Sequence, residues 1–372
     1  MSRFDSWVNT GPFSARDVGL FRIVFTLLLI PYLPRLSGLG AYPSGLLDPP
    51  AGPFAMLREF PPVPVLVVME LVIAVAVVAT LCGLYTRVAS ILLTVMLVIA
   101  YGLVFSLGKV DHVAVMISVP AIMSFARWGD TFSLDALRRR PRRGRGSATG
   151  DPTTIHPTRS QPQWPLRFLA IAIGIAFVTA AIPKVSNGWL DFSTQASYGY
   201  QVRQNFIAES PGLLAGVLAH FPSAPLWEML DWVTVLLELG VLVSVLSWTT
   251  WRTVLSLLTL FHLAIALSLG IFFVGNVLAY GAFVSWGRVR LPAWHLSVRT
   301  SEALARFGPA GVLIVGAIVW IAGDALWSVR LDVGVIILVA GAGTGAGYLI
   351  RLARALLRRF VTARSERAAP VA

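Results

Sequence analysis

The sequence predicts an all-α, polytopic membrane protein, and three observations lead to that prediction. Hydrophobic residues make up 56% of the 372 residues and charged residues only 13%, whereas soluble domains contain about 25% charged residues. The mean hydropathy is +0.75. Several windows of about twenty apolar residues have the length of a transmembrane helix. A bundle of membrane-spanning helices is therefore expected.

About ten transmembrane helices are expected along the chain, from the positions of its apolar windows. The third and fourth would be joined only by the tight turn GKVD at 108–111. The seventh and eighth meet at LSLGIFFVGN, residues 267–276, and form either one bent helix or two short ones. The expected ranges are 18–36, 64–83, 88–108, 111–126, 166–183, 226–247, 252–270, 272–287, 309–327 and 332–350.

The distribution of basic residues predicts that both termini lie on the cytoplasmic side. With ten helices and the N-terminus inside, most arginines fall in cytoplasmic segments, and the outer loops keep few. This agrees with the excess of Lys and Arg in the cytoplasmic loops of membrane proteins. The net charge of +12 therefore indicates topology, and we expect the lipid bilayer, not a nucleic acid, as the partner of these charges.

A segment rich in Arg, Pro, Gly and Ser divides the predicted helices into two groups. Such composition is typical of a disordered linker, and its arginines could also contact anionic headgroups. The basic tail is expected to form an amphipathic helix on the cytoplasmic face. The predicted parts are a four-helix half at 1–137, the linker at 138–165, a second half at 166–290, two additional helices within 291–350, and the tail at 351–372.

Two predicted outer loops are long, at 42–62 and from 186 to about 225. They contain several Pro and aromatic residues, and short helices are expected in them. Long ordered loops beside a rigid scaffold often contain functional residues.

Ionisable side chains within the predicted spans are the first candidates for function. Each costs about 2.5–3.5 kcal/mol on insertion scales, so each needs a physical reason. They are Arg22, Glu70, His112, Lys184, Asp231, Glu238, His262 and Asp324.

Three carboxylates share one face of the predicted helix 226–247. Glu228, Asp231 and Glu238 are spaced by three and seven residues, which brings them to one side of a helix. We expect the first two to be solvated near the outer boundary. Glu238 would lie deeper and needs a partner, for which Arg22, His262 and Lys184 are candidates. It is either half of a structural ion pair or a proton-handling carboxylate.

Two histidines have alternative interpretations. His262 lies in an apolar run and is either a packing residue or a ligand. His112 follows Asp111, and the two either position an imidazole for acid–base chemistry or cap a helix. Five histidines without an HExxH spacing, and one cysteine, predict no metal site.

The glycine-rich run GAGTGAG, residues 341–347, resembles a phosphate loop only in composition. It follows no predicted strand and precedes no Lys-Ser/Thr pair. Small residues at four-residue spacing allow helices to approach closely. The run therefore predicts helix packing.

Lys184 is one of only two lysines in the chain, and it follows Pro183 at the end of an apolar run. Proline lacks an N–H and disfavours helical geometry in the residue before it, so we expect the helix to end or bend here. If the amine reaches water, Lys184 is a membrane-end anchor. If the following loop covers it, desolvation favours the neutral amine, which is a base.

Taken together, these motifs resemble the HTTM family, the membrane portion of vitamin K-dependent gamma-carboxylase and its bacterial relatives. The similarity spans about residues 15–290. It includes VGLFRIVFTLLL, GLYTRVASILL, KVDHVAVMISVPAIMSFARWGDTFSLDAL, AAIPKVSNGWLDF, LLELGVLVSV and LFHLAIALSLGIFFVGNVLAYGAF.

The resemblance implies roles for individual residues. Lys184, with Trp189 after it, matches the lysine regarded as the base that deprotonates reduced vitamin K. His112 matches a family histidine that follows Asn, where this chain has Asp111. Glu238 matches the family's acidic residue approximately. A reduced quinone is therefore implied as a bound molecule.

The chain departs from the carboxylase after residue 290, where apolar spans replace a large lumenal domain. Carboxylation of protein glutamates is therefore not expected. The leading hypothesis is an enzyme of the bacterial plasma membrane that acts on a quinol or lipid-like molecule. Its cavity near the outer leaflet would be lined by Lys184, His112, Glu238 and His262, with Arg22 in support. The alternative is a non-enzymatic lipid or small-molecule binder, a transporter, or a membrane partner protein.

Overall fold

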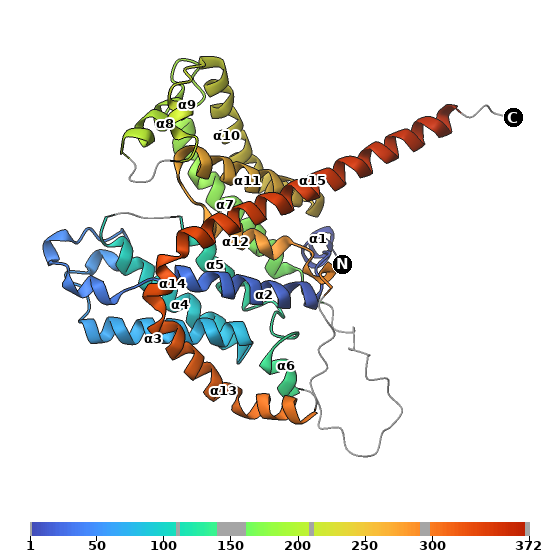
Figure 1. Ribbon diagram of the computed structural model, residues 1–372. Helices are drawn as coiled ribbons and strands as arrows, with labels where there is room; N and C mark the ends of the chain where they lie inside the picture. Colours follow the sequence, from blue (N-terminus) through green and yellow to red (C-terminus); the bar gives the residue numbers. More distant parts are fainter. Residues whose placement is uncertain (1, 109–111, 140–160, 208–211, 291–297, 369–372) are drawn as a thin grey trace. The chain divides into compact units, whose positions relative to one another are not determined.

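The computed structural model describes residues 2–108, 112–139, 161–207, 212–290 and 298–368, and each named element in them is a helix (Figure 1). The α-helices are α1 Arg3–Asn9, α2 Ala15–Leu29, α3 Val63–Cys82, α4 Thr86–Phe105, α5 Ala114–Met123, α6 Leu134–Arg139, α7 Trp164–Ser186, α8 Ala196–Ile207, α9 Ala215–Ala219, α10 Ala224–Ser244, α11 Trp248–Leu269, α12 Val274–Tyr280, α13 Val298–Ile321, α14 Gly323–Ser328 and α15 Arg330–Ala368. The predicted all-α class is confirmed.

The chain forms two compact units, each built from two segments. The first unit contains Met1–Leu169 and Leu278–Val333, and the second contains Ala170–Val277 and Gly334–Ala372. The helices α7, α12 and α15 each contribute residues to both units.

Seven helical segments in the described residues are long and apolar enough to cross a membrane. They are Ala15–Ala41, Val63–Cys82, Thr86–Phe105, Trp164–Ser186, Trp248–Leu269, Glu302–Ile321 and Arg330–Thr362. The other three expected ranges, 111–126, 272–287 and 226–247, correspond to α5, α12 and α10. The helices α5 and α12 are too short to be counted among the seven, with ten and seven residues. The helix α10 is long enough but contains three acidic residues. The chain is thus a helical membrane protein.

The expected range 252–287 contains two α-helices. The helix α11 ends at Leu269, and α12 begins at Val274. Between them Gly270 adopts a left-handed conformation, with φ of 69°. Glycine has no Cβ to clash in this conformation, so it is a common residue at helix ends.

The predicted outer loops contain short helices, as expected. Residues 42–62 include the 3-10 helices Ser44–Leu46 and Pro53–Met56, and the segment after α7 includes α8 and α9. Each unit therefore has ordered structure outside its long apolar helices.

In the first unit, Glu70 is fully hydrogen-bonded although it lies inside α3. One carboxylate oxygen accepts the backbone N–H groups of Leu36 and Ser37, at 2.5 and 2.8 Å. The other accepts the Trp320 indole N–H at 3.0 Å and lies 3.5 Å from Arg35. Arg35 also pairs with the exposed Asp324 at 3.0 Å. Glu70 and Asp324 therefore belong to a structural network.

Arg22 of α2 is completely buried in the first unit. Its Nη2 donates to the Phe132 carbonyl at 2.5 Å. Gly83, with φ of 65°, faces the guanidinium so closely that a Cβ there would clash with it. Arg22 is therefore part of the packed core of this unit.

In the second unit, glycines bring helices together. A Cβ on Gly174 of α7 would lie 2.9 Å from Leu242 Cα of α10. A Cβ on Gly345 of α15 would lie 2.9 Å from the Ser256 carbonyl of α11, and one on Gly341 would meet Val277 at 2.6 Å. The packing role predicted for the run 341–347 is confirmed.

The ends of the predicted linker 138–165 are structured, because Arg138 and Arg139 close α6 and Trp164 begins α7. Residues 140–160 lie outside the described residues, so the disorder predicted for them stays a prediction. The helix α15 continues through the predicted tail to Ala368 without a break (Figure 1).

Candidate functional site

The candidate site begins in the last turn of α7, in the second unit. The helix continues through Pro183 to Ser186, so of the two predicted alternatives the end at the proline was wrong, and the bend stays a prediction. Pro183 removes one backbone donor, but its own carbonyl accepts the N–H of Asn187 at 2.9 Å. Lys184 is consequently held on a helical turn.

A tight turn after α7 brings the chain back over Lys184. Gly188 adopts φ of 80°, which glycine tolerates, and the Trp189 N–H donates to the Lys184 carbonyl at 3.1 Å. Asp191 accepts the backbone N–H and the hydroxyl of Ser193, at 3.0 and 2.8 Å. These two hydrogen bonds, the backbone one first, lower the pKa of Asp191 below its usual value.

Lys184 forms an ion pair with Glu238 of α10. The ammonium donates a hydrogen bond to Glu238 Oε1. The close approach of α7 and α10 at Gly174 brings the two side chains together. Of the three partners considered for Glu238, the structure selects Lys184.

The pair is largely shielded from solvent. The Lys184 side chain is 23% exposed and that of Glu238 only 7%. The Lys184 amine also lies 5.4 Å from the centroid of the Trp189 ring, within the range of a cation–π contact. The amine therefore has a carboxylate and an aromatic ring as neighbours.

Glu238 keeps one free acceptor. Its Oε2 is buried and has no hydrogen-bond partner among the described residues. Buried polar atoms are nearly always satisfied, so such an oxygen needs an explanation. The site can accept one further hydrogen bond beside the amine.

The other two carboxylates of α10 are buried, which corrects the expectation that they are solvated. Asp231 is 0% exposed, and its Oδ1 accepts the backbone N–H of Ser197 at 2.8 Å and also the Ser197 hydroxyl. Glu228 is 7% exposed and accepts the indole N–H of Trp232 at 3.0 Å. The loop after α7, through α8, covers this end of α10.

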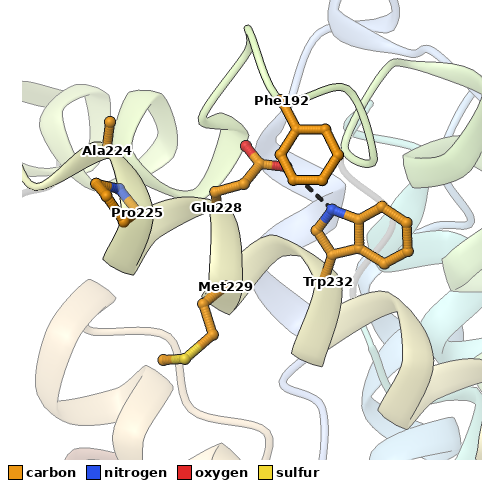
Figure 2. Close-up of a pocket in the computed structure, with 6 residues that line it drawn as sticks. All are labelled: Phe192, Ala224, Pro225, Glu228, Met229 and Trp232. Carbon is orange, nitrogen blue, oxygen red and sulfur yellow. Dashed lines mark hydrogen bonds between the residues drawn. The ribbon is translucent and has the colours of Figure 1, made fainter.

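Glu228 lines an open pocket at the start of α10 (Figure 2). The pocket is formed by Phe192, Ala224, Pro225, Glu228, Met229 and Trp232. The three-residue spacing of Glu228 and Asp231 was visible in the sequence. Their cover was not, because Ser197 of α8 lies 34 positions before Asp231, and the sequence does not indicate which segments are neighbours.

His262 of α11 is 2% exposed and lies among aromatic rings. Its ring stacks on Phe273 at 4.8 Å and on Phe177 at 6.0 Å between centroids. These contacts favour the packing interpretation over the ligand one.

The remaining candidates belong to the first unit. His112 is exposed in a turn two residues before α5 begins at Ala114. Asp111 lies outside the described residues, and Arg22 is buried against Phe132 and Gly83. The second unit thus contains Lys184, Glu238, Trp189 and His262.

Metal ligands do not gather in the described part of the chain, where no three His, Cys, Asp or Glu side chains are placed to hold an ion. The three carboxylates of α10 instead accept hydrogen bonds from different donors: Glu238 from a lysine, Asp231 from a serine and Glu228 from an indole N–H.

Comparison with known proteins identifies the family. The HTTM domain matches residues 11–284, which is most of the chain and includes Lys184, Trp189 and Glu238. No curated protein matches the chain, and no solved structure does. By the extent of this match, the chain belongs to the HTTM family.

Proposed function

We propose that this HTTM protein is a membrane-embedded enzyme that acts on a quinol or lipid-like substrate, with Lys184 as the base. The observation that supports the proposal is the position of the Lys184 amine between the Glu238 carboxylate and the Trp189 ring. A partly desolvated amine beside a carboxylate is an arrangement used for proton transfer.

The proposed step is a proton transfer from a hydroxyl group of the substrate. In one tautomer of the pair, the shared proton is on Glu238 and the Lys184 amine is neutral. The amine takes the hydroxyl proton, which leaves an ammonium on Lys184 and an oxyanion on the substrate. The ammonium stabilises that oxyanion, and Glu238 holds the ammonium in place.

The free Glu238 Oε2 suits the same substrate. It belongs to the same carboxylate as the Oε1 that accepts the Lys184 ammonium, so it can accept a hydrogen bond from a substrate hydroxyl, or from a water, next to the amine. By its resemblance to the carboxylase, the proposal includes His112 as a second acid–base residue, with Asp111 orienting it. Arg22, His262 and Trp189 would support the site.

The second candidate function is a non-enzymatic binder, a transporter or a membrane partner protein. The ion pair itself favours it, since Lys184 and Glu238 neutralise one another without a substrate. The aromatic pocket at the start of α10 also suits a bound small molecule (Figure 2).

The proposed setting is the plasma membrane of a bacterium, with about ten helices and both termini in the cytoplasm. The arginine-rich α15 and the Arg-rich segment 138–165 support this orientation. Labelling of single cysteines in intact cells would test it. Labelling of a cysteine in the turn 186–195 by a membrane-impermeant reagent is expected.

The catalytic proposal is tested with tetramethylhydroquinone, a soluble quinol, under argon. Wild-type protein should bind it and give the absorption spectrum of the quinolate at a pH where the free quinol is neutral. Lys184→Met should retain binding within a few fold and lose the quinolate spectrum. Arg203→Met, an exposed cation of α8 in the same unit, should behave as wild type.

Two results would refute this reasoning. A quinolate spectrum in Lys184→Met equal to that of wild type would leave Lys184 as a structural partner of Glu238. If the wild type does not bind the quinol, a quinol is not the substrate, and the second candidate function, a non-enzymatic binder, is favoured.

A further inference from the structure

The pocket at the start of α10 is separate from the Lys184–Glu238 pair. Glu228 and Glu238 are ten residues apart on one helix, which corresponds to about 15 Å at 1.5 Å per residue. The pocket has a volume of about 590 Å³, within the range of about 300–1,000 Å³ that is typical of small-molecule sites.

Glu228 is the one ionisable residue among the six that line the pocket. It is more than nine-tenths buried. Its Oε1 accepts the Trp232 indole N–H, and its Oε2 has no hydrogen-bond partner in the described part of the chain. Figure 2 shows the carboxylate at the aromatic side of the pocket, beside Trp232.

Glu228 also differs from the other buried glutamates in its charge balance. Glu70 pairs with Arg35, and Glu238 pairs with Lys184. No Lys, Arg or His of the described residues forms an ion pair with Glu228. A buried carboxylate without a counter-ion is unfavourable, so a cation supplied by a ligand would complete the site.

The walls of the pocket define the kind of cation. The rings of Phe192 and Trp232 lie 5.9 Å apart between centroids, and aromatic faces attract ammonium groups. Ala224, Pro225 and Met229 form an apolar wall on the other side (Figure 2). Apolar and aromatic side chains do not coordinate a hydrated metal ion, whereas they make favourable contacts with an alkyl chain.

We propose that this pocket binds a ligand that has an ammonium group on an apolar chain. Glu228 is the counter-ion, Phe192 and Trp232 are the aromatic wall, and Met229 contacts the chain. The ligand is either the headgroup region of an amine-containing lipid or a free alkylamine.

The test measures binding of decylammonium and of decanol, its neutral analogue, to the purified full-length protein in a neutral detergent. Wild type should bind decylammonium at least tenfold more tightly than decanol. Glu228→Gln should weaken decylammonium binding at least tenfold and change decanol binding less than twofold. Glu302→Gln, at an exposed glutamate of α13, should leave both unchanged.

A second variant keeps the test valid if Glu228→Gln is unstable. Met229→Trp fills the pocket without a change of charge, and it should abolish binding of both molecules. Equal affinity of wild type for decylammonium and decanol would overturn the proposal. So would full decylammonium binding by either the Glu228→Gln or the Met229→Trp variant.

Nanodiscs distinguish the two sources of the ammonium group. If the lipid headgroup is the natural occupant, phosphatidylethanolamine should weaken decylammonium binding at least threefold relative to a neutral glycolipid. Equal affinity in both lipids would assign the pocket to a free amine. Because these measurements do not involve Lys184, their failure leaves the proposed proton transfer untouched.

Discussion

Replacing Lys184 by methionine should destabilise the protein more than replacing Glu238 by glutamine. Removing one partner of a buried ion pair costs about 3–5 kcal/mol, whereas an exposed pair contributes about 0–1 kcal/mol. The side chains are 23% and 7% exposed, so this pair is closer to the buried limit.

The asymmetry follows from what each substitution leaves behind. In Lys184→Met both oxygens of Glu238 lack a partner in apolar surroundings, and we expect a loss of about 2–3 kcal/mol. In Glu238→Gln the ammonium keeps its contact with the Trp189 ring and part of its exposure, and we expect a loss of about 1 kcal/mol. The double variant Lys184→Met with Glu238→Leu should lie within about 1 kcal/mol of wild type.

The assay is unfolding of the purified protein in mixed micelles with increasing dodecyl sulfate, with Arg203→Met as the control at an exposed cation. A double-mutant cycle built from Lys184→Met, Glu238→Leu and their double variant should give a coupling of about 2 kcal/mol between the two residues. A coupling near zero, or losses as small as in the control, would show that the pair is not an energetic unit. Lys184 would then be the anchor that its position at the end of α7 first suggested.

Three further outcomes are expected. Gly345→Ala should destabilise the packing of α15 on α11 by about 1–3 kcal/mol, because its Cβ would meet backbone atoms at 2.9 and 3.1 Å. A Cβ on Gly343 would meet no atom within 4 Å, so Gly343→Ala should not destabilise the protein in the same micelle assay, and alanine's higher helix propensity could stabilise it by up to about 1 kcal/mol. Equal effects of the two substitutions would refute the packing role of Gly345. Glu70→Ala should lower the free energy of unfolding by about 2–4 kcal/mol, because it leaves several buried donors without an acceptor. Asp324→Asn changes an exposed side chain and should alter the free energy of unfolding by less than about 0.5 kcal/mol. Folding lowers the pKa of Asp191, so its carboxylate stabilises the turn at pH values above its ordinary pKa, and this contribution is lost as the pH falls through the lowered pKa. Hydrogen exchange of the turn, corrected for intrinsic rates, should therefore show that the turn opens on acidification in wild type. An Asp191→Asn variant should show no such pH dependence.

Several features of the fold were predictable because they depend on local sequence. Apolar length identified the long helices, and small-residue spacing identified the packing face of α15, which meets Ser256 and Val277. The end of α7 was misplaced by one turn, because a single proline affects only one or two backbone hydrogen bonds. The turn at Gly188 follows, with the Trp189 N–H donating to the Lys184 carbonyl.

The candidate site was predictable only as a set of residues. Hydropathy indicates that Glu238 and Lys184 are costly in a membrane, but it contains no information about which helices are neighbours. The two residues are 54 positions apart, and the near contact of Gly174 with Leu242 decides that they meet.

By itself, therefore, the sequence determined the membrane class, the helical segments, the ionisable side chains within them and the resemblance to the HTTM family. The tertiary structure alone decided that Lys184, and not Arg22 or His262, neutralises Glu238. It also decided that Glu228 is buried at a pocket whose six described lining residues include no basic side chain. The physical reason is that insertion cost is a property of each segment, whereas charge compensation depends on atoms that only the packing of distant segments brings together.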